Sequence, residues 1–146
     1  MKTYFENQKF WLLIILTLPV ILFAFLDYGL QWGISPMGKV AFVFTVSLLF
    51  LVYLLLYRMQ IDVMDQKVKI SFGVGLLSKE IDVSQIRSIR IVKGKWYYGS
   101  GIHLLSNGVI YNVNANDAVE IMLKSGYRIH IGTYNPYALK KAIEEA

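Results

Sequence analysis

Two long runs of uncharged, mostly apolar residues constrain this chain more than any other feature. The first run extends from Phe10 to Leu26, and the second extends from Val40 to Tyr57. A helix of about 17–25 apolar residues crosses the roughly 30 Å hydrocarbon core of a bilayer. Segments such as Leu48–Leu56 are apolar all round and lack the polar face of a helix in a soluble protein. The sequence therefore predicts two transmembrane helices, over about residues 10–29 and 39–58.

The charges that flank these runs predict their orientation. Lys2 and Lys9 precede the first run and Arg58 follows the second, whereas the connector 27–39 carries one acid and one base. Cytoplasmic flanks carry the excess of Lys and Arg. We therefore expect a multi-pass protein with both termini in the cytoplasm, in which residues 1–58 form the membrane hairpin.

From residue 59 onward the pattern changes to alternation with a period of two, which is typical of half-buried strands. Asn107-Gly108 matches a two-residue type I′ turn, which would place His103 opposite Asn112. A three-residue loop at 124–126 would place Glu120 opposite His130. Counting strands between such turns predicts about seven short antiparallel strands. Further turns are expected at Asp65-Gln66 and near Asp82–Gln85.

The last residues of the chain predict a helix. Asn135 is a good N-cap and Pro136 a good first helical residue. Leu139, Ala142 and Ile143 then share one face, which would pack on a sheet. The expected fold is an α+β membrane protein: a two-helix transmembrane hairpin, then an antiparallel β-barrel or sandwich at 59–146, capped by a C-terminal α-helix.

The composition of the chain excludes several kinds of site and partner. The chain contains no cysteine, which excludes disulfides, thiolate metal sites and cysteine nucleophiles. Residues 58–146 carry twelve Lys or Arg and eight Asp or Glu, a balance that suits a domain close to anionic lipid. The acids offset the bases too fully for a basic stripe, so we expect no nucleic-acid partner.

Two stretches of the second half carry a family resemblance. "KEIDVSQIRSIRIVK" is similar to the strand–turn–strand signature of bacterial pleckstrin-homology-like domains. The stretch from "KWYYGSGIHLL" to "YRIHIGT", followed by "NPYALKKAIEEA", resembles small bacterial membrane proteins that carry such a domain after two spans. The resemblance covers roughly residues 59–146. It implies a bacterial inner-membrane protein whose cytoplasmic domain binds or scaffolds a partner, without a catalytic motif or cofactor.

A cluster of lysines and rings predicts where that partner binds. Aromatic rings favour the headgroup region of a bilayer, and each lysine near anionic lipid contributes about 1 kcal/mol. The same rings also fit packing against the domain itself or contact with another membrane protein, including a second copy. The predicted contact patch is Lys93, Lys95, Trp96, Tyr97 and Tyr98, and the basic residues expected close to lipid are Arg58, Lys67 and Lys69.

Two further functions stay open from the sequence. His103, Glu120 and His130 are the residue types of a 2-His-1-carboxylate metal site, which would make the chain a metal- or ligand-dependent sensor or enzyme. An exposed histidine paired with a cross-strand carboxylate explains the same residues without metal or catalysis. The chain also suits an accessory subunit of a transporter or of a peptide-resistance system. We expect no catalytic residues, no metal and no cofactor.

Overall fold

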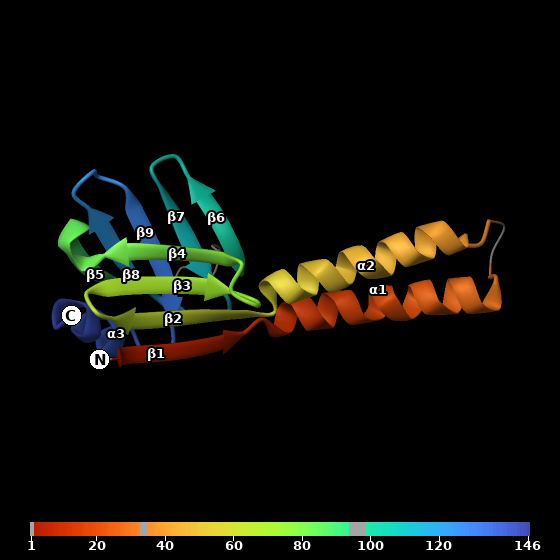
Figure 1. Cartoon of the computed structure of the whole chain (residues 1–146), viewed down its shortest axis with the longest axis horizontal. Coiled ribbons are helices and arrows are strands. Elements are labelled where there is room, and N and C mark those ends of the chain that lie inside the picture. The colour runs from red at the N-terminus through yellow and green to blue at the C-terminus, as the bar shows by residue number, and fades with distance from the viewer. Residues whose placement is uncertain (1, 33–34, 94–98) are drawn as a thin grey trace.

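The structure, a computed structural model, describes residues 2–32, 35–93 and 99–146 (Figure 1). Helices α1 (Trp11–Leu30) and α2 (Lys39–Leu56) lie side by side and project from a β-rich domain. Both are long and apolar enough to cross a membrane, with mean hydropathies of 2.2 and 2.4. Only 6% and 0% of their most apolar windows are buried, unlike the core helices of a soluble protein.

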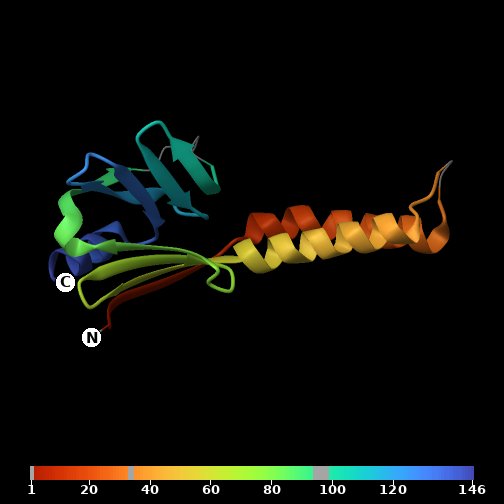
Figure 2. The same ribbon diagram turned by 45° about the horizontal axis from the view of Figure 1, so that its top comes forward.

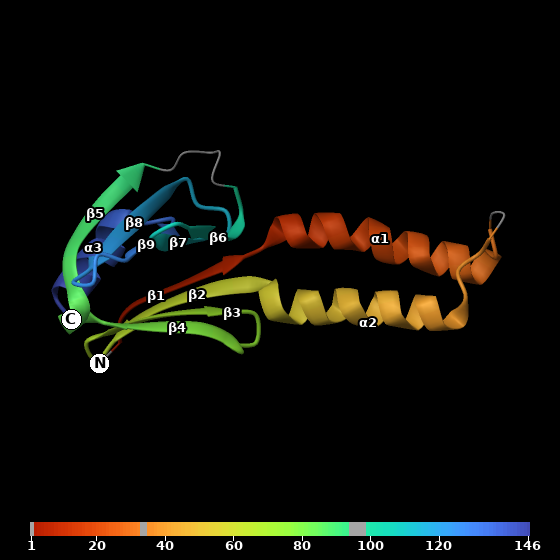
Figure 3. The same cartoon turned by 90° about the horizontal axis from the view of Figure 1, so that it is seen from above.

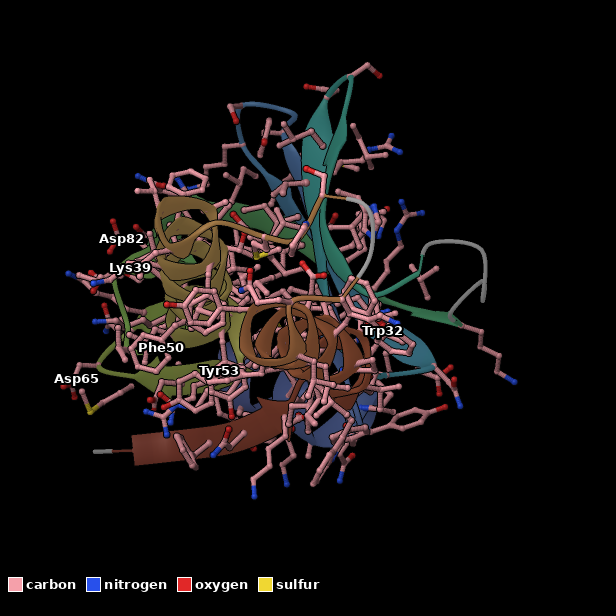
Figure 4. The ribbon with its side chains drawn as sticks, turned by 90° about the vertical axis from the view of Figure 1, so that its right-hand side faces the viewer. Trp32, Lys39, Phe50, Tyr53, Asp65 and Asp82 are labelled. Atoms are coloured by element: carbon pink, nitrogen blue, oxygen red, sulfur yellow. The ribbon has the colours of Figure 1, made fainter. Side chains whose placement is uncertain are left out.

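Aromatic rings join the two helices near the connector. The ring of Phe42 stacks on Tyr28 at 4.5 Å between centroids and meets the edge of Phe25 at 5.0 Å. Figure 4 looks along the helix pair from the connector end and shows Trp32 and Phe50 on its periphery, directed away from the partner helix. An exterior of this kind can face lipid, because apolar side chains carry no hydrogen-bonding groups that would need water.

The N-terminal residues form a strand that the sequence analysis did not predict. Strand β1 (Lys2–Lys9) pairs antiparallel with β2 (Arg58–Met64), so residues assigned to the membrane hairpin belong to a sheet. The inward side chains of β1 are polar or amphipathic, at Tyr4, Glu6 and Gln8. An apolar–polar alternation is therefore missing, and pairing with β2 is what specifies the strand.

The strands of the described residues form two sheets. The first has the order β1-β2-β3-β4, with β3 (Lys67–Phe72) and β4 (Leu77–Asp82). The second has the order β5-β8-β9-β7-β6. Nine strands are thus described where about seven were expected, and β7 pairs with β9 in parallel. The second sheet consists of β5 (Ile86–Lys93), β6 (Gly101–Leu105), β7 (Gly108–Asn112), β8 (Asp117–Leu123) and β9 (Arg128–Thr133).

The two sheets face each other as the layers of a sandwich (Figure 2). A short 3₁₀ turn at Val83–Gln85 carries the chain from β4 to β5 and hence from one sheet to the other. Strands β4 and β6 end their respective sheets, and the described pairings do not join them to each other. The predicted sandwich therefore fits the structure, whereas closure into a barrel is not observed among the described strands.

Alternating apolar side chains from both sheets fill the space between them. The inward residues of β2 and β3 are buried, as are Val119 and Ile121 of β8 and Ile129 and Ile131 of β9. Helix α3 (Pro136–Glu144) packs into one end of this core through the predicted face of Leu139, Ala142 and Ile143. The Asn135 side chain accepts a hydrogen bond from the Ala138 N–H at 3.1 Å, which confirms the predicted N-cap.

A polar network joins the two sheets on the β1 side. The Glu6 carboxylate accepts hydrogen bonds from the Tyr4 and Thr133 hydroxyls, from the Gln8 amide at 2.7 Å and from the Tyr134 N–H at 2.9 Å. Gln8 is fully buried and also donates to the Gly132 carbonyl at 2.8 Å. Burial, reinforced by the Glu6 carboxylate, raises the pKa of Tyr4 to about 12. We call this network together with α3 the closed side of the sandwich.

Two of the predicted turns have the expected register. Asp65 and Gln66 both have positive φ, at 49° and 61°, and join β2 to β3 as a two-residue turn. In the β8–β9 hairpin the Leu123 N–H donates to the Tyr127 carbonyl, and Glu120 lies opposite His130 as predicted.

The predicted Asn107-Gly108 turn is wrong by one position. Leu105 pairs with Gly108, so the turn residues are Ser106 and Asn107, and His103 lies opposite Ile110 rather than Asn112. A Cβ at Gly108 would come within 2.3 Å of the Arg128 carbonyl oxygen. The glycine therefore allows close approach of β9 instead of making the turn.

Each helix passes directly into a strand. Phe10 alone separates β1 from α1, and Tyr57 alone separates α2 from β2. The Phe10 N–H donates to the Tyr57 carbonyl at 2.9 Å, and the Val74 N–H donates to the Leu54 carbonyl at 3.1 Å. Because both connections are short and hydrogen-bonded, the first sheet continues the helix pair without a flexible linker.

Candidate binding groove between the two sheets

The predicted contact patch falls mainly outside the described residues. Lys95, Trp96, Tyr97 and Tyr98 lie outside the ranges that the structure describes. Lys93 is described: it is exposed at the end of β5 and lies opposite Asp117 of β8. The patch therefore remains a prediction.

The three basic residues expected close to lipid lie at different heights along the first sheet. The Arg58 Nε donates to the Gly73 carbonyl at 3.1 Å, and its guanidinium lies 5.1 Å from the centre of the Tyr57 ring, at the helix junction. Lys67 lies opposite Met64, six residues along β2, and a strand rises roughly 3.3 Å per residue, so it is about 20 Å from the junction.

Lys67 and Lys69 also have protein partners. Their ammonium groups lie 3.8 Å and 3.3 Å from the Glu80 carboxylate on the outer face of the first sheet. Lys67 and Lys69 thus lie farther from the helices than Arg58 does, and their closeness to lipid stays a prediction. Of the three, Arg58 alone lies at the helix junction.

Glu120 and His130 come together as their predicted register requires. Glu120 is only 6% exposed; its Oε1 accepts hydrogen bonds from Arg90 Nη2 at 2.6 Å and Nε at 3.2 Å. His130 Nε2 lies 3.4 Å from the other carboxylate oxygen. Burial lowers the pKa of His130 and outweighs the opposite effect of the Glu120 carboxylate. The buried Glu120 carboxylate therefore has Arg90 of β5 as its hydrogen-bond donor and His130 of β9 beside its other oxygen.

His103 does not complete a metal site with this pair. It lies opposite Ile110 of β7, which in turn lies opposite His130, so a whole strand separates the two histidines. Within the ranges that the structure describes, no group of three or more His, Asp or Glu side chains could hold a metal ion. All three predicted ligands belong to those ranges, and the structure brings only two of them together.

The open edge of the sandwich, between β4 and β6, contains a cavity of about 320 Å³. Sites for small ligands usually measure roughly 300–1,000 Å³ and are mostly apolar with a few polar groups. We call this cavity the groove, and the side of the sandwich on which it lies the open side. The groove is lined by Ile70, Phe72, Leu77, Ser78, Lys79, Ile102, Leu104, Val109, Tyr111 and Tyr127.

Apolar side chains at the mouth of the groove are left uncovered. Leu104 is 83% exposed although its register partner, Val109, is buried. Leu77 and Ile102 are 42% and 41% exposed, on the two facing edges. Exposed apolar residues gathered at one concave place mark an interaction site more often than scattered ones do.

Lys79 is the charged residue of the groove lining. It lies opposite Ile70, and Leu77 and Ile81 flank it two residues away on the same strand, so it occupies an inward position of β4. An inward charge on an end strand also discourages edge-to-edge aggregation. Whether Lys79 protects the edge or binds a ligand, it places a positive charge beside an otherwise apolar wall.

Two tyrosines form part of the floor. The Tyr111 ring lies 5.8 Å from that of Phe72, which connects the two sheets beneath the groove. Burial raises the pKa of Tyr111, and the neighbouring Tyr127 adds to the effect. The Tyr111 hydroxyl therefore stays neutral at physiological pH and can act as a hydrogen-bond donor.

One end of the groove lies close to the helices. Phe72 and Leu77 lie opposite each other and close the β3–β4 hairpin through residues 73–76. A Cβ at Gly73 would come within 2.0 Å of the Leu54 carbonyl oxygen, so this hairpin touches the last turn of α2. Leu76, in the same turn, is 76% exposed. This end of the groove, at Phe72 and Leu77, therefore lies next to the end of α2, and β4 runs from there away from the helices (Figures 1 and 3).

This groove was not predicted from the sequence. Its signal was the pattern Leu77-Ser78-Lys79-Glu80-Ile81, in which a lysine interrupts an apolar face. That pattern alone equally fits an ordinary end strand, because only the separation of β4 from β6 turns the interruption into the wall of a cavity.

Comparison with known proteins adds no relative. No protein-family model matches the chain. No curated protein and no solved structure matches it either. The resemblance to bacterial pleckstrin-homology-like domains thus remains a prediction from the sequence.

Proposed function

We propose that this is a non-enzymatic protein of the bacterial inner membrane that holds a cytoplasmic, pleckstrin-homology-like binding domain against the bilayer. The α1–α2 hairpin is its anchor, and both termini lie in the cytoplasm. The proposal rests on one observation: two almost entirely unburied apolar helices enter a strand pair through single residues, Phe10 and Tyr57. Such an anchor raises the effective concentration of the domain for any membrane-bound partner.

A binding role agrees better with the described chemistry than a catalytic one does. The Glu120 carboxylate is already engaged by Arg90 and His130, and His103 lies a strand away. The groove, in contrast, offers uncovered apolar surface next to the helices. The proposed partner is a component of the same membrane.

Single-cysteine labelling tests the anchor and its orientation. The chain has no native cysteine, so Ser35→Cys in the connector and Ser125→Cys in the β8–β9 loop each provide a unique thiol. A membrane-impermeant maleimide should label Ser35→Cys from the outside of the inner membrane. It should label Ser125→Cys only after the membrane is permeabilised.

The reverse labelling pattern would overturn the proposed orientation. Recovery of the protein in the aqueous fraction without detergent would overturn the anchor itself. A matched control, Asn7→Cys on β1, should behave like Ser125→Cys, because β1 belongs to the same sheet as β2.

A further inference from the structure

The polarity of the groove points to the chemistry of its ligand. Its walls come from apolar side chains of both sheets, and its polar groups are few: Ser78, Lys79 and two tyrosine hydroxyls. An extended peptide lying between the two sheets, away from the free backbone edges of β4 and β6, would carry an N–H and a C=O at every residue among these side chains, and burying these groups unpaired costs free energy. A hydrocarbon chain has no such groups. The lining therefore favours an acyl chain over a peptide.

Lys79 adds charge complementarity. Lys79 occupies an inward position of β4, with Leu77 and Ile81 at the neighbouring inward positions. A carboxylate or phosphate at the end of an acyl chain would pair with it, and Tyr127 of the second sheet also lines the groove. The nearby Lys67 and Lys69 pair with Glu80 on the opposite face of the sheet, so they do not compete for this position.

The direction of the groove matches the orientation of a membrane lipid. The wall next to α2 is apolar, at Phe72 and Leu77, and Lys79 lies two residues farther from the helices along β4. A lipid raised partly from the leaflet would therefore keep its tail toward the bilayer and its head group at Lys79. The cavity of about 320 Å³ lies near the lower limit of roughly 300 Å³ for ligand pockets, which suits one chain rather than two.

We propose that the groove between β4 and β6 binds the acyl chain of an anionic, single-chain amphiphile drawn from the adjacent leaflet. Lys79 pairs with the acidic head group, and the apolar walls of the two sheets enclose the chain. This inference rests on the proposed membrane anchor, since the anchor is what brings the groove to the leaflet.

Photo-crosslinking of the full chain in lipid nanodiscs tests this proposal. The nanodiscs consist of a zwitterionic phospholipid with a small fraction of a fatty acid that carries a diazirine in its chain. Peptide mass spectrometry should map adducts to β4 and β6 as well as to α1 and α2. The Leu104→Asp and Lys79→Gln variants should each reduce the groove adduct about tenfold, whereas Lys141→Glu on the far helix α3 should leave it unchanged.

The head group is tested with the matching fatty alcohol. In the wild type the alcohol should give several-fold less groove adduct than the acid, and in Lys79→Gln the two should be equal. Leu104 and Lys79 are exposed, so both variants should keep the wild-type melting temperature, which separates loss of binding from loss of fold.

The helix adducts make the two proposals distinguishable. Adducts on α1 and α2 without any on β4 or β6 would overturn the groove proposal and leave the anchor standing. Absence of helix adducts would overturn the anchor. Adducts on β4 and β6 that persist in Leu104→Asp and Lys79→Gln would also overturn the groove proposal, because the fatty acid would then contact only the outer surface of these strands. If an acidic apolar peptide displaces the fatty acid at a concentration below that of the fatty acid, the lipid proposal is overturned and the ligand of the groove is a protein segment.

Discussion

The closed and open sides of the sandwich contain similar residues in opposite states. On the closed side, Leu139 and Ile143 of α3 are fully buried. On the open side, Leu104 and Leu76 are largely exposed. The difference comes from the elements at hand, because α3 and β1 cover one side whereas β4 and β6 face each other without a covering element among the described residues. Apolar side chains are therefore buried on the closed side and exposed to solvent on the open side.

The strongest test of this comparison is a pair of leucine truncations. Leu139→Ala should lower the free energy of unfolding by about 2–5 kcal/mol, the usual cost of a large buried deletion. Leu104→Ala should change it by less than about 0.5 kcal/mol, as exposed positions do. Denaturant unfolding in detergent micelles measures both. A large loss for Leu104→Ala would mean that the groove is covered in solution.

The second-largest loss of stability is expected from the polar network of the closed side. Glu6→Ala removes an acceptor shared by Tyr4, Gln8, Thr133 and the Tyr134 N–H. Hydrogen bonds to charged groups contribute about 1.5–3 kcal/mol, and we expect a loss in that range from the same unfolding experiment. Asn7→Ala, at the exposed neighbouring position, is the control and should be close to neutral. Equal losses for the two variants would show that Glu6 does not join the sheets.

A glycine pair tests the helix end of the open side. Gly73 and Gly75 both have positive φ, so alanine strains the backbone at either position. Only at Gly73 does the added Cβ meet the α2 backbone; at Gly75 it meets nothing within 4 Å. Overpacking costs about 1–3 kcal/mol, which is the excess destabilisation expected for Gly73→Ala over Gly75→Ala. Equal thermal stability of the two variants would argue against the hydrogen-bonded junction.

The smallest effect concerns alkaline pH. The pKa of Tyr4 is raised from 10.0 to about 12, so its contribution to stability is complete below pH 10 and is lost as the pH rises to about 12. The free energy of unfolding should fall across this window, and Tyr4→Phe should flatten the decline. Tyr111→Phe, whose raised pKa belongs to the groove, should flatten it less. A pH series of unfolding curves checks the order, and an unchanged slope in Tyr4→Phe would contradict the buried network.

Prediction succeeded where a local pattern determines the element. Continuous apolar runs specify α1 and α2, and the cap at Asn135 with the face of Leu139 and Ile143 specifies α3. The Asp65-Gln66 turn has the expected register for the same reason. Prediction failed where the partner is distant in the sequence. Strand β1 forms because it pairs with β2, and the role of Gly108 is set by close approach to the Arg128 backbone, twenty residues away.

The sequence by itself determined two long apolar helices and a β-rich domain with a helical end, because hydropathy and alternation are local properties. Tertiary structure alone decided which side of that domain stays open. Whether Leu104 and Lys79 belong to a core or to a groove depends on the separation of β4 from β6. The residues next to them in the sequence do not decide it. The same holds for His103, which the fold places a full strand away from its predicted partners.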